Sequence, residues 1–537
     1  MKRQFSFSAI MMTCMVMVAV FLSSCESKSD HVRAIIPSDA PVVMEINIEK
    51  LTLKSNVANY KDQLADMIVA ADENDRTALK IADALRKMDD GGLNFHKPVY
   101  LFTTADIEGL FITASVRSKD AVNATVLDLG DGKFRLVEED GLTWIETEGH
   151  ETIGVFNSEY FLLGTSEEKE LYEKLITEDG GFFDTSMGQA MSSNAGDITL
   201  MLNAQAVKKD KMKLLRTLLI QKLGKEGAVL ENDEVWGALC KTQLVTNLKF
   251  SVGEISLNIH NAGEKAPQGA FTKVSGDVFD NIPSRGLFGM LAMGINGEEL
   301  SKILDAKVAE SGADMDNETR MVVMMLSAYI KAMNGTAAFS VSLEGLSSDP
   351  GIVALLPIAK ERSQYLFNMI SKELDKPLYL TGDNAYTAVS NMRAYEYGYV
   401  HPSVDLASHA KGCYAYGYFD IGKLLMMAME DNSIKYENPA YYQTLLDFVE
   451  QLGYAEIKVT SFDDMSIIMK LQDNEHNSLS VLLTRSFDLG LQYLQYREAQ
   501  SYDYYDDYDD DYVYLDYLGE SDMYPDSLWT PVDEVEW

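Results

Sequence analysis

One pattern recurs along the chain: an apolar run ends in Asn or Asp, and a helical pattern follows at once. It occurs at 46–51, INIEKL, and again at 419–424, FDIGKL. A side-chain oxygen at this point can accept a hydrogen bond from a free amide of the first helical turn, which stabilises the helix by about 1 kcal/mol. The pattern therefore predicts strand-to-helix corners of the same kind at four residues, namely Asn47, Asn203, Asn296 and Asp420.

Other matched segments lie between these corners and keep their order in both parts of the chain. The run from Gly109 to Val116 resembles the run from Gly351 to Ile358, and a helical pattern follows each. Such collinear matches favour an internal duplication, because independent coincidences would not preserve order. The predicted equivalent positions, in order, are Asn47, Gly109, Tyr160 and Asn203 in one half and Asn296, Gly351, Tyr386 and Asp420 in the other.

The predicted fold is α+β, with one half at 31–265 and a related half at 266–498. Gly263, Pro267 and Gly269 mark the boundary between them. Each half is expected to close with alternating apolar strands, and these are predicted at 243–261 and 455–486.

Hairpin signals favour a mostly antiparallel sheet with helices packed on one face. The signals are Asp131-Gly132 and Asp140-Gly141, since this dipeptide suits a two-residue hairpin turn.

The first residues have the pattern of an export signal. Lys2 and Arg3 precede the apolar run Ala9–Phe21, and Leu-Ser-Ser then leads to Cys25. The run is too short to predict a membrane-spanning helix, so residues 1–24 are predicted to be a signal peptide. The sequence around Cys25 resembles the lipobox of bacterial lipoproteins, in which the cysteine is lipidated. The alternative is an ordinary signal peptide that contains a cysteine.

A lipidated Cys25 predicts an outer-membrane lipoprotein of the cell envelope, held to the membrane by its acyl chains. Residues 25–30 would then form a polar tether. Periplasmic and surface-facing placements both remain open. No later segment has 18 uninterrupted apolar residues.

Charge is unevenly distributed along the chain, whose formal net charge is −37. This charge argues against a nucleic-acid partner, which would need a basic surface. The C-terminal segment 499–537 contains thirteen Asp and Glu residues after Ser501 and no Lys or Arg, which predicts a disordered tail. Its many tyrosines favour a basic protein partner, while a purely solubilising tail and weak cation binding remain alternatives.

Few side chains suggest redox or metal chemistry. Once Cys25 is lipidated, only Cys240 and Cys413 remain in the body, either paired or, as we favour, as two buried thiols. Helical spacing predicts core positions rather than Cu(I) ligands for six methionines, Met321, Met324, Met325, Met426, Met427 and Met429.

The segment after the lipobox carries a family resemblance. Residues 31–43, HVRAIIPSDAPVV, resemble an uncharacterised family of Bacteroidetes lipoproteins known as domain of unknown function 4836. Its most specific part is IPSDAPVV. The resemblance implies an envelope lipoprotein, without an established activity, substrate or site residues.

No nucleotide-binding, hydrolase or zinc-protease motif is found, and the seven histidines lack metal-ligand spacing. We therefore expect no catalytic residues, no cofactor and no metal site. The sequence favours a non-catalytic binding or scaffold lipoprotein. The alternative is an envelope hydrolase with an active site built from dispersed residues.

Overall fold

The computed structural model describes residues 31–71, 79, 82–83, 86, 91–107, 109–130, 132–178, 180–224, 226–263, 268–282, 286–311, 317–343, 350–370, 378–391, 405–429 and 438–509. The predicted signal peptide, the lipidation site Cys25 and residues 510–537 of the predicted tail lie outside this range.

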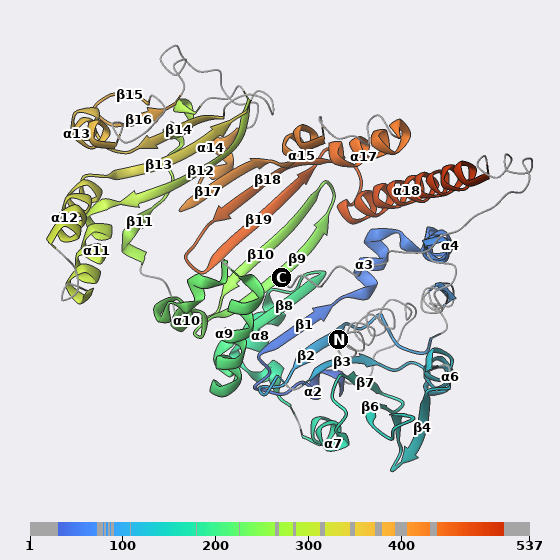
Figure 1. Ribbon diagram of the computed structural model, residues 1–537. Coiled ribbons are helices and arrows are strands. Elements are labelled where there is room, and N and C mark those ends of the chain that lie inside the picture. The colour runs from blue at the N-terminus through green and yellow to red at the C-terminus, as the bar shows by residue number, and fades with distance from the viewer. Residues whose placement is uncertain are drawn as a thin grey trace, which may run out of the picture.

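A single antiparallel sheet of 19 strands forms the framework (Figure 1). Its first half contains β1 (Val42–Ile46), β2 (Val99–Thr103), β3 (Leu110–Ser115), β4 (Phe134–Glu139), β5 (Leu142–Thr147), β6 (Thr152–Phe156), β7 (Tyr160–Gly164), β8 (Ile198–Asn203), β9 (Gln243–Ser251) and β10 (Glu254–Asn261). Its second half contains β11 (Phe271–Thr272), β12 (Leu287–Asn296), β13 (Asn334–Ser342), β14 (Gly351–Leu356), β15 (Tyr379–Gly382), β16 (Thr387–Ser390), β17 (Ala415–Asp420), β18 (Leu452–Val459) and β19 (Asp464–Leu471).

The connecting helices are α2 (His31–Ala34), α3 (Ile48–Ser55), α4 (Lys61–Ala71), α6 (Lys119–Gly130), α7 (Lys169–Thr177), α8 (Ser186–Ser193), α9 (Lys209–Leu223), α10 (Asp233–Leu239), α11 (Gly297–Ser311), α12 (Asn317–Lys331), α13 (Lys360–Ile370), α14 (Leu406–Ala410), α15 (Ile421–Met429), α17 (Pro439–Gln451) and α18 (Ser478–Asp509). Three short 3₁₀ segments enter the argument, η3 (Phe182–Asp184), η5 (Glu226–Glu231) and η7 (Gly276–Asn281).

The same order of strand pairing occurs twice. In the first half the neighbours run β6-β7-β3-β2-β1-β8-β9-β10, and in the second they run β15-β16-β14-β13-β12-β17-β18-β19. Asn47 and Asn296 therefore end equivalent strands, and so do Asn203 and Asp420. The α+β prediction with two related halves is confirmed, while their exact boundaries stay a prediction.

The halves join through their equivalent edge strands, β10 and β19. Leu257 pairs with Ile467 at the centre of this ladder, and Glu254–Lys470 and His260–Asp464 pair three positions away on either side. Both outer pairs are also ion pairs, with 2.8 Å between His260 Nδ1 and Asp464 Oδ1. The pairing is therefore approximately symmetric about a two-fold axis that passes between Leu257 and Ile467 and relates the two halves.

Three of the four predicted corners have the expected cap. Asn47 Oδ1 accepts from the amide of Lys50 at 3.0 Å, and Asp420 Oδ1 accepts from Lys423 at 2.9 Å. Asn296 Oδ1 accepts from the amide of Glu299 at a longer distance, 3.4 Å. Asn203 is the exception, because its Oδ1 accepts from the side chain of Gln243 instead and a 3₁₀ turn follows it.

Helices cover both faces of the sheet in the first half. Ile112 and Phe161 face one cluster, which includes Val122 of α6 and Ile48 of α3. Phe111 and Leu162, one position away, face a second cluster with α2, α7, α8 and η3. Strands β3 and β7 are therefore buried on both sides. The sequence predicted helices on one face of the sheet, and in this half a second set of helices covers the other face as well. In the second half, η7 and α14 form a buried cluster with one face of β12 and β17.

Three local predictions are corrected. Asp140-Gly141 does form the β4–β5 hairpin, with φ of 51° and 81°, but Gly132 lies on the connection from α6 to β4. The strand expected at 477–486 is the start of α18, because Asn477 Oδ1 accepts from Leu479 and the helix then continues unbroken. That helix reaches Asp509, so the first residues of the predicted disordered tail are helical.

Candidate functional site

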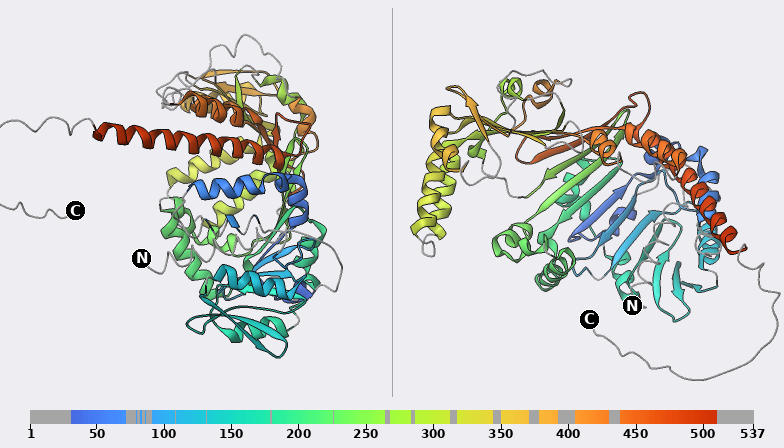
Figure 2. Two further views of the ribbon diagram at one scale, coloured as in Figure 1. Left: turned by 90° about the vertical axis from the view of Figure 1, so that its right-hand side faces the viewer. Right: turned by 45° about the horizontal axis from the view of Figure 1, so that its top comes forward.

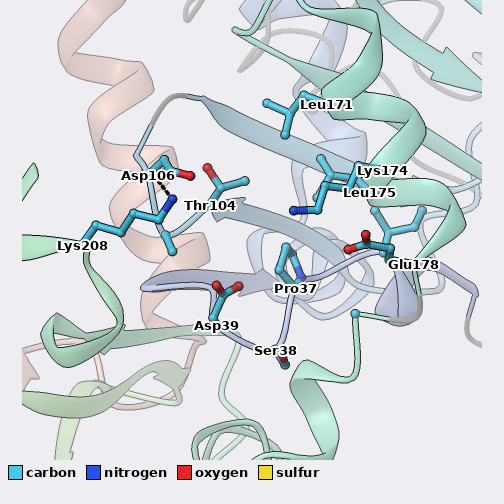
Figure 3. A pocket seen from close by; sticks show the side chains of 13 residues that line it. Pro37, Ser38, Asp39, Thr104, Asp106, Leu171, Lys174, Leu175, Glu178 and Lys208 are labelled. Atoms are coloured by element: carbon cyan, nitrogen blue, oxygen red, sulfur yellow. Dashed lines mark ion pairs between the residues drawn. The ribbon is translucent and has the colours of Figure 1, made fainter.

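A pocket of about 370 Å³ lies beside α7 and is lined by the IPSDAPVV segment (Figure 3). Pro37 forms a β-bridge with Gly181, and the amide of Gly180 donates to Ala34 O at 2.7 Å. A Cβ at position 180 would lie 2.1 Å from the backbone oxygen of Ile36, so only glycine permits this contact. The family-specific segment is thus held closely against the chain that follows α7.

Charges of both signs line the pocket. Asp39, Asp106 and Glu178 supply carboxylates, and Lys174 and Lys208 supply ammonium groups (Figure 3). Lys208 is paired with Asp106, so part of the positive charge is already neutralised. This mixture does not select one class of ligand.

The neighbouring turn is strained. Ile107, which follows Asp106, has φ of 54°, a conformation that a β-branched residue rarely adopts. Its amide donates to Thr104 O at 2.8 Å, so a tight turn at the pocket's rim fixes this conformation.

A second feature extends across both halves of the sheet, and we name it the apolar sheet face. It comprises the side chains on one side of β13, β12, β17, β18, β19, β10 and β9. The strand registers place seven residues in one row, Phe339, Leu291, Gly417, Ile457, Ile467, Leu257 and Leu248. A second row contains Phe419, Ala455, Met469, Ile255 and Phe250. In β9, β10, β18 and β19, only Thr246 and Asn261 are polar on this side.

The apolar sheet face is not part of a core. Leu291 and Phe339 are 47% and 46% exposed. Leu257, Ile457 and Ile467 are partly exposed and belong to none of the buried clusters. Helices stand along its borders on the same side of the sheet, and α18 extends well away from it (Figure 2). Alternating apolar strands would normally face a layer of helices. In the described part of the chain, α18 meets these strands at its start, where Ser478 Oγ donates to Glu254 O at 2.8 Å.

The opposite side of the same strands is polar. Ser466 Oγ donates to Asn258 at 2.7 Å, and Asn258 in turn donates to Asn247 at 3.1 Å. These side chains satisfy one another, so this side needs no further partner.

A buried carboxylate, Glu456, lies on this polar side. It accepts hydrogen bonds from Tyr416 at 2.6 Å and His409 at 2.7 Å, and it pairs with Lys458 at 3.1 Å. Burial alone would raise the pKa of Glu456, but these three partners outweigh it and hold the pKa below its usual range. Burial, followed by the bond to Glu456, raises the pKa of Tyr416. All of these groups are engaged with one another, which is typical of a structural network.

The predictions for the methionines and the cysteines are confirmed in part. Met427 and Met429 are buried as predicted. The core assignment is wrong for Met321, Met324 and Met325 of α12 and for Met426 of α15, all of which are exposed. Cys240 and Cys413 are unpaired, and only Cys413 is buried. Within the described ranges, no three His, Cys, Asp or Glu side chains are grouped so as to hold a metal ion.

Sequence reasoning missed the apolar sheet face. Its strands other than β13 were predicted, but two of them, β10 and β19, lie about 200 residues apart in sequence. Which sides face together depends on the register between them, and no local pattern encodes that register. The available signal was that both halves close with strands of alternating apolar residues, so that each half contributes one apolar side.

No helix in the described part of the chain is long and apolar enough to cross a membrane. A comparison with curated proteins found no match. Two solved structures, crystal forms I and IV of TP0453, show low similarity, each with 14% identity. Form I gives a TM-score of 0.25 over 45% of this chain and 81% of that one, and form IV gives 0.24 over 42% and 79%.

The family comparison is more extensive. The family described as domain of unknown function DUF4836 matches residues 32–401, which include the IPSDAPVV segment and the pocket. The chain therefore belongs to the DUF4836 family.

Proposed function

We propose that this chain is a lipid-anchored, non-catalytic binding protein of the cell envelope, and that its ligand is a long acyl chain bound on the apolar sheet face. The observation that carries the proposal is the continuous, partly exposed apolar surface from Phe339 to Leu248. Contiguous exposed apolar surface of this kind is typical of binding sites.

The chemistry of the surface favours hydrocarbon. The central row offers no hydrogen-bonding side chain, so a ligand with polar groups along its length would leave them unsatisfied. Seven strands at about 4.8 Å spacing give a row about 29 Å long, roughly twice the depth of one leaflet of a bilayer. An extended acyl chain therefore fits along it, and each buried CH₂ group contributes about 0.8 kcal/mol.

The envelope location rests on the signal peptide and lipobox predicted at residues 1–25. Lipid anchoring at Cys25 would place the apolar sheet face close to a source of acyl chains. For the alternative, an envelope hydrolase, the charged pocket and the Glu456 network supply no reacting pair of groups.

The test uses the mature chain with Cys25→Ser, titrated with a fluorescent long-chain fatty acid. The variant Leu291→Ser/Phe339→Ser changes the two most exposed side chains of the central row, so folding should be little affected. We expect binding to weaken about ten-fold, because each substitution removes apolar contact area. The matched control, Leu53→Ser/Leu127→Ser, changes exposed leucines of α3 and α6 and should bind as the parent does.

Equal affinity of the two double variants would overturn the proposal, as would an absence of binding by the parent chain. Turnover of a hydrolase substrate that a single carboxylate substitution abolishes would favour the enzyme instead.

A further inference from the structure

Helix α9 has the composition of a surface helix but exposes leucines. Leu214 and Leu218 are 56% and 44% exposed, and Leu219 and Leu223 are 42% and 48% exposed. No residue of α9 is buried. Each pair is spaced four residues apart and so forms one ridge on the helix.

The same helix is basic within an acidic protein. Residues 208–225 contain seven Lys and Arg and one Asp, whereas the whole chain has a net charge of −37. The exposed lysines Lys209, Lys213 and Lys222 have no ion pair among the described residues. Positive charge is therefore concentrated on one element that also presents leucines.

Arg216 links α9 to the two segments that follow it, η5 and α10. Its Nε and Nη2 donate to Leu230 O at 2.9 Å and Glu231 O at 2.7 Å, and it pairs with Asp233 at 2.8 Å. Its guanidinium also lies 5.6 Å from the ring centre of Trp236. We name the unit α9–η5–α10 the basic hairpin after the charge of α9, because η5 and α10 themselves carry acidic residues, Glu226, Glu231, Asp233 and Glu234. The arginine fixes its shape, and Lys209, Lys213 and Lys222 of α9 point to solvent.

The basic hairpin also exposes apolar residues beyond α9. Val229 of η5 and Leu239 of α10 are exposed, and α10 has no buried residue. The unit stands at the border of the sheet, on the side from which α18 extends (Figures 1 and 2). Packing within the fold thus does not explain why apolar residues occupy these exposed positions.

We propose that the basic hairpin docks on the surface of a bilayer that contains anionic lipids. Leu214 and Leu218, which form one of the two ridges, would enter the boundary between headgroups and acyl chains, while Lys209, Lys213 and Lys222 contact lipid phosphates. Long lysine side chains can place their charge at the headgroups while their stems lie along apolar surface. An anionic membrane matches both the positive charge of α9 and the leucines that this helix exposes.

The position of the hairpin suits this role. Lys208, just before α9, lines the same pocket as Pro37 and Asp39, so α9 begins beside the N-terminal end of the body (Figure 3). A tether over residues 25–30 would span at most about 20 Å, at 3.3–3.6 Å per residue. This orientation argument rests on the lipid anchor of the proposed function, but hairpin binding itself does not require the anchor.

Flotation with vesicles tests the inference on the mature chain with Cys25→Ser, so that no acyl chain contributes. The vesicles contain phosphatidylcholine alone, or phosphatidylcholine with one third phosphatidylglycerol. We expect binding to the mixed vesicles only, and weaker binding as salt rises. Lys209→Gln/Lys213→Gln/Lys222→Gln should weaken it about 100-fold, equivalent to about 3 kcal/mol at about 1 kcal/mol per lysine.

Two further variants separate charge from apolar insertion. Leu214→Ala/Leu218→Ala should weaken binding about ten-fold while the helix is kept, since alanine is the best helix former. The charge control, Lys133→Gln/Lys249→Gln/Lys411→Gln, removes three exposed lysines elsewhere and should leave binding unchanged. Circular dichroism establishes that each variant is folded.

No binding of the parent chain to anionic vesicles would overturn the inference. Binding that persists in the α9 variants would also overturn it, because another surface would then be responsible. Neither result bears on the fatty-acid titration, which probes the apolar sheet face.

Discussion

A single buried carboxylate connects helix α3 to the sheet. Asp197 of the β8 segment is 2% exposed, and both of its oxygens accept from Lys54 of α3, at 2.8 and 2.7 Å. It also accepts from the amide of Phe250 at 2.7 Å, which links it to β9. One carboxylate thus connects a helix and two strands. It stands at the start of a strand, where the sequence gives no sign of burial.

Lys54→Met should therefore destabilise the fold by about 3 kcal/mol, because it leaves a buried carboxylate without its counter-charge. Chemical denaturation of the variant and the parent measures the difference. Lys50→Met, on an exposed position of the same helix, should change stability by less than about 0.5 kcal/mol. Similar stability of the two variants would show that water replaces the lysine.

The Glu456 network predicts a dependence of stability on pH. Since its pKa lies below the usual value in the folded state, the ionised carboxylate stabilises the fold. This contribution is fully present above the unfolded pKa of about 4.3 and is lost as the pH falls through the folded pKa. Glu456→Gln should lower stability at neutral pH and flatten the acid limb of the profile. An unchanged acid limb in urea unfolding would contradict the assignment.

At the scale of elements, the sequence predicted most strands and helix starts from two local signals. Alternation located β9 and β10, and capping located the starts of α3 and α15. The same alternation misled at 477–486, where a cap at Asn477 and uninterrupted propagation favour a helix. The exposed methionines of α12 show the other limit, because helical spacing identifies an apolar stripe but not what covers it.

The first part of the long helix α18 packs on the body. Phe487 packs against Tyr60, and Tyr493 packs against Tyr441, with ring centres 6.1 and 6.0 Å apart. Truncation after Gln500 should therefore leave the thermal midpoint almost unchanged, because the contacts up to Tyr493 are kept. A clear drop in the midpoint by calorimetry would mean that later residues pack on the body.

For the whole molecule, the near-symmetric β10–β19 ladder makes a prediction about isolated halves. The residues of both first-half clusters lie within 32–245, so the fragment 31–263 keeps its own cores. It would expose β10 as an unpaired edge, and unpaired edges recruit strands. We expect the fragment to dimerise through β10 pairing with itself about Leu257, detectable by light scattering. Leu257→Pro should remain monomeric, since proline interrupts the ladder. A monomeric parent fragment would contradict this expectation.

The position of β1 has a mechanical consequence. This strand, the first among the described residues, lies between β2 and β8 and is hydrogen-bonded to both along its length. A pull on the N-terminus is therefore resisted by two ladders at once, and it loads them in shear rather than one bond at a time. A protein tethered at this end could bear tension while the remote half of its sheet stays unloaded.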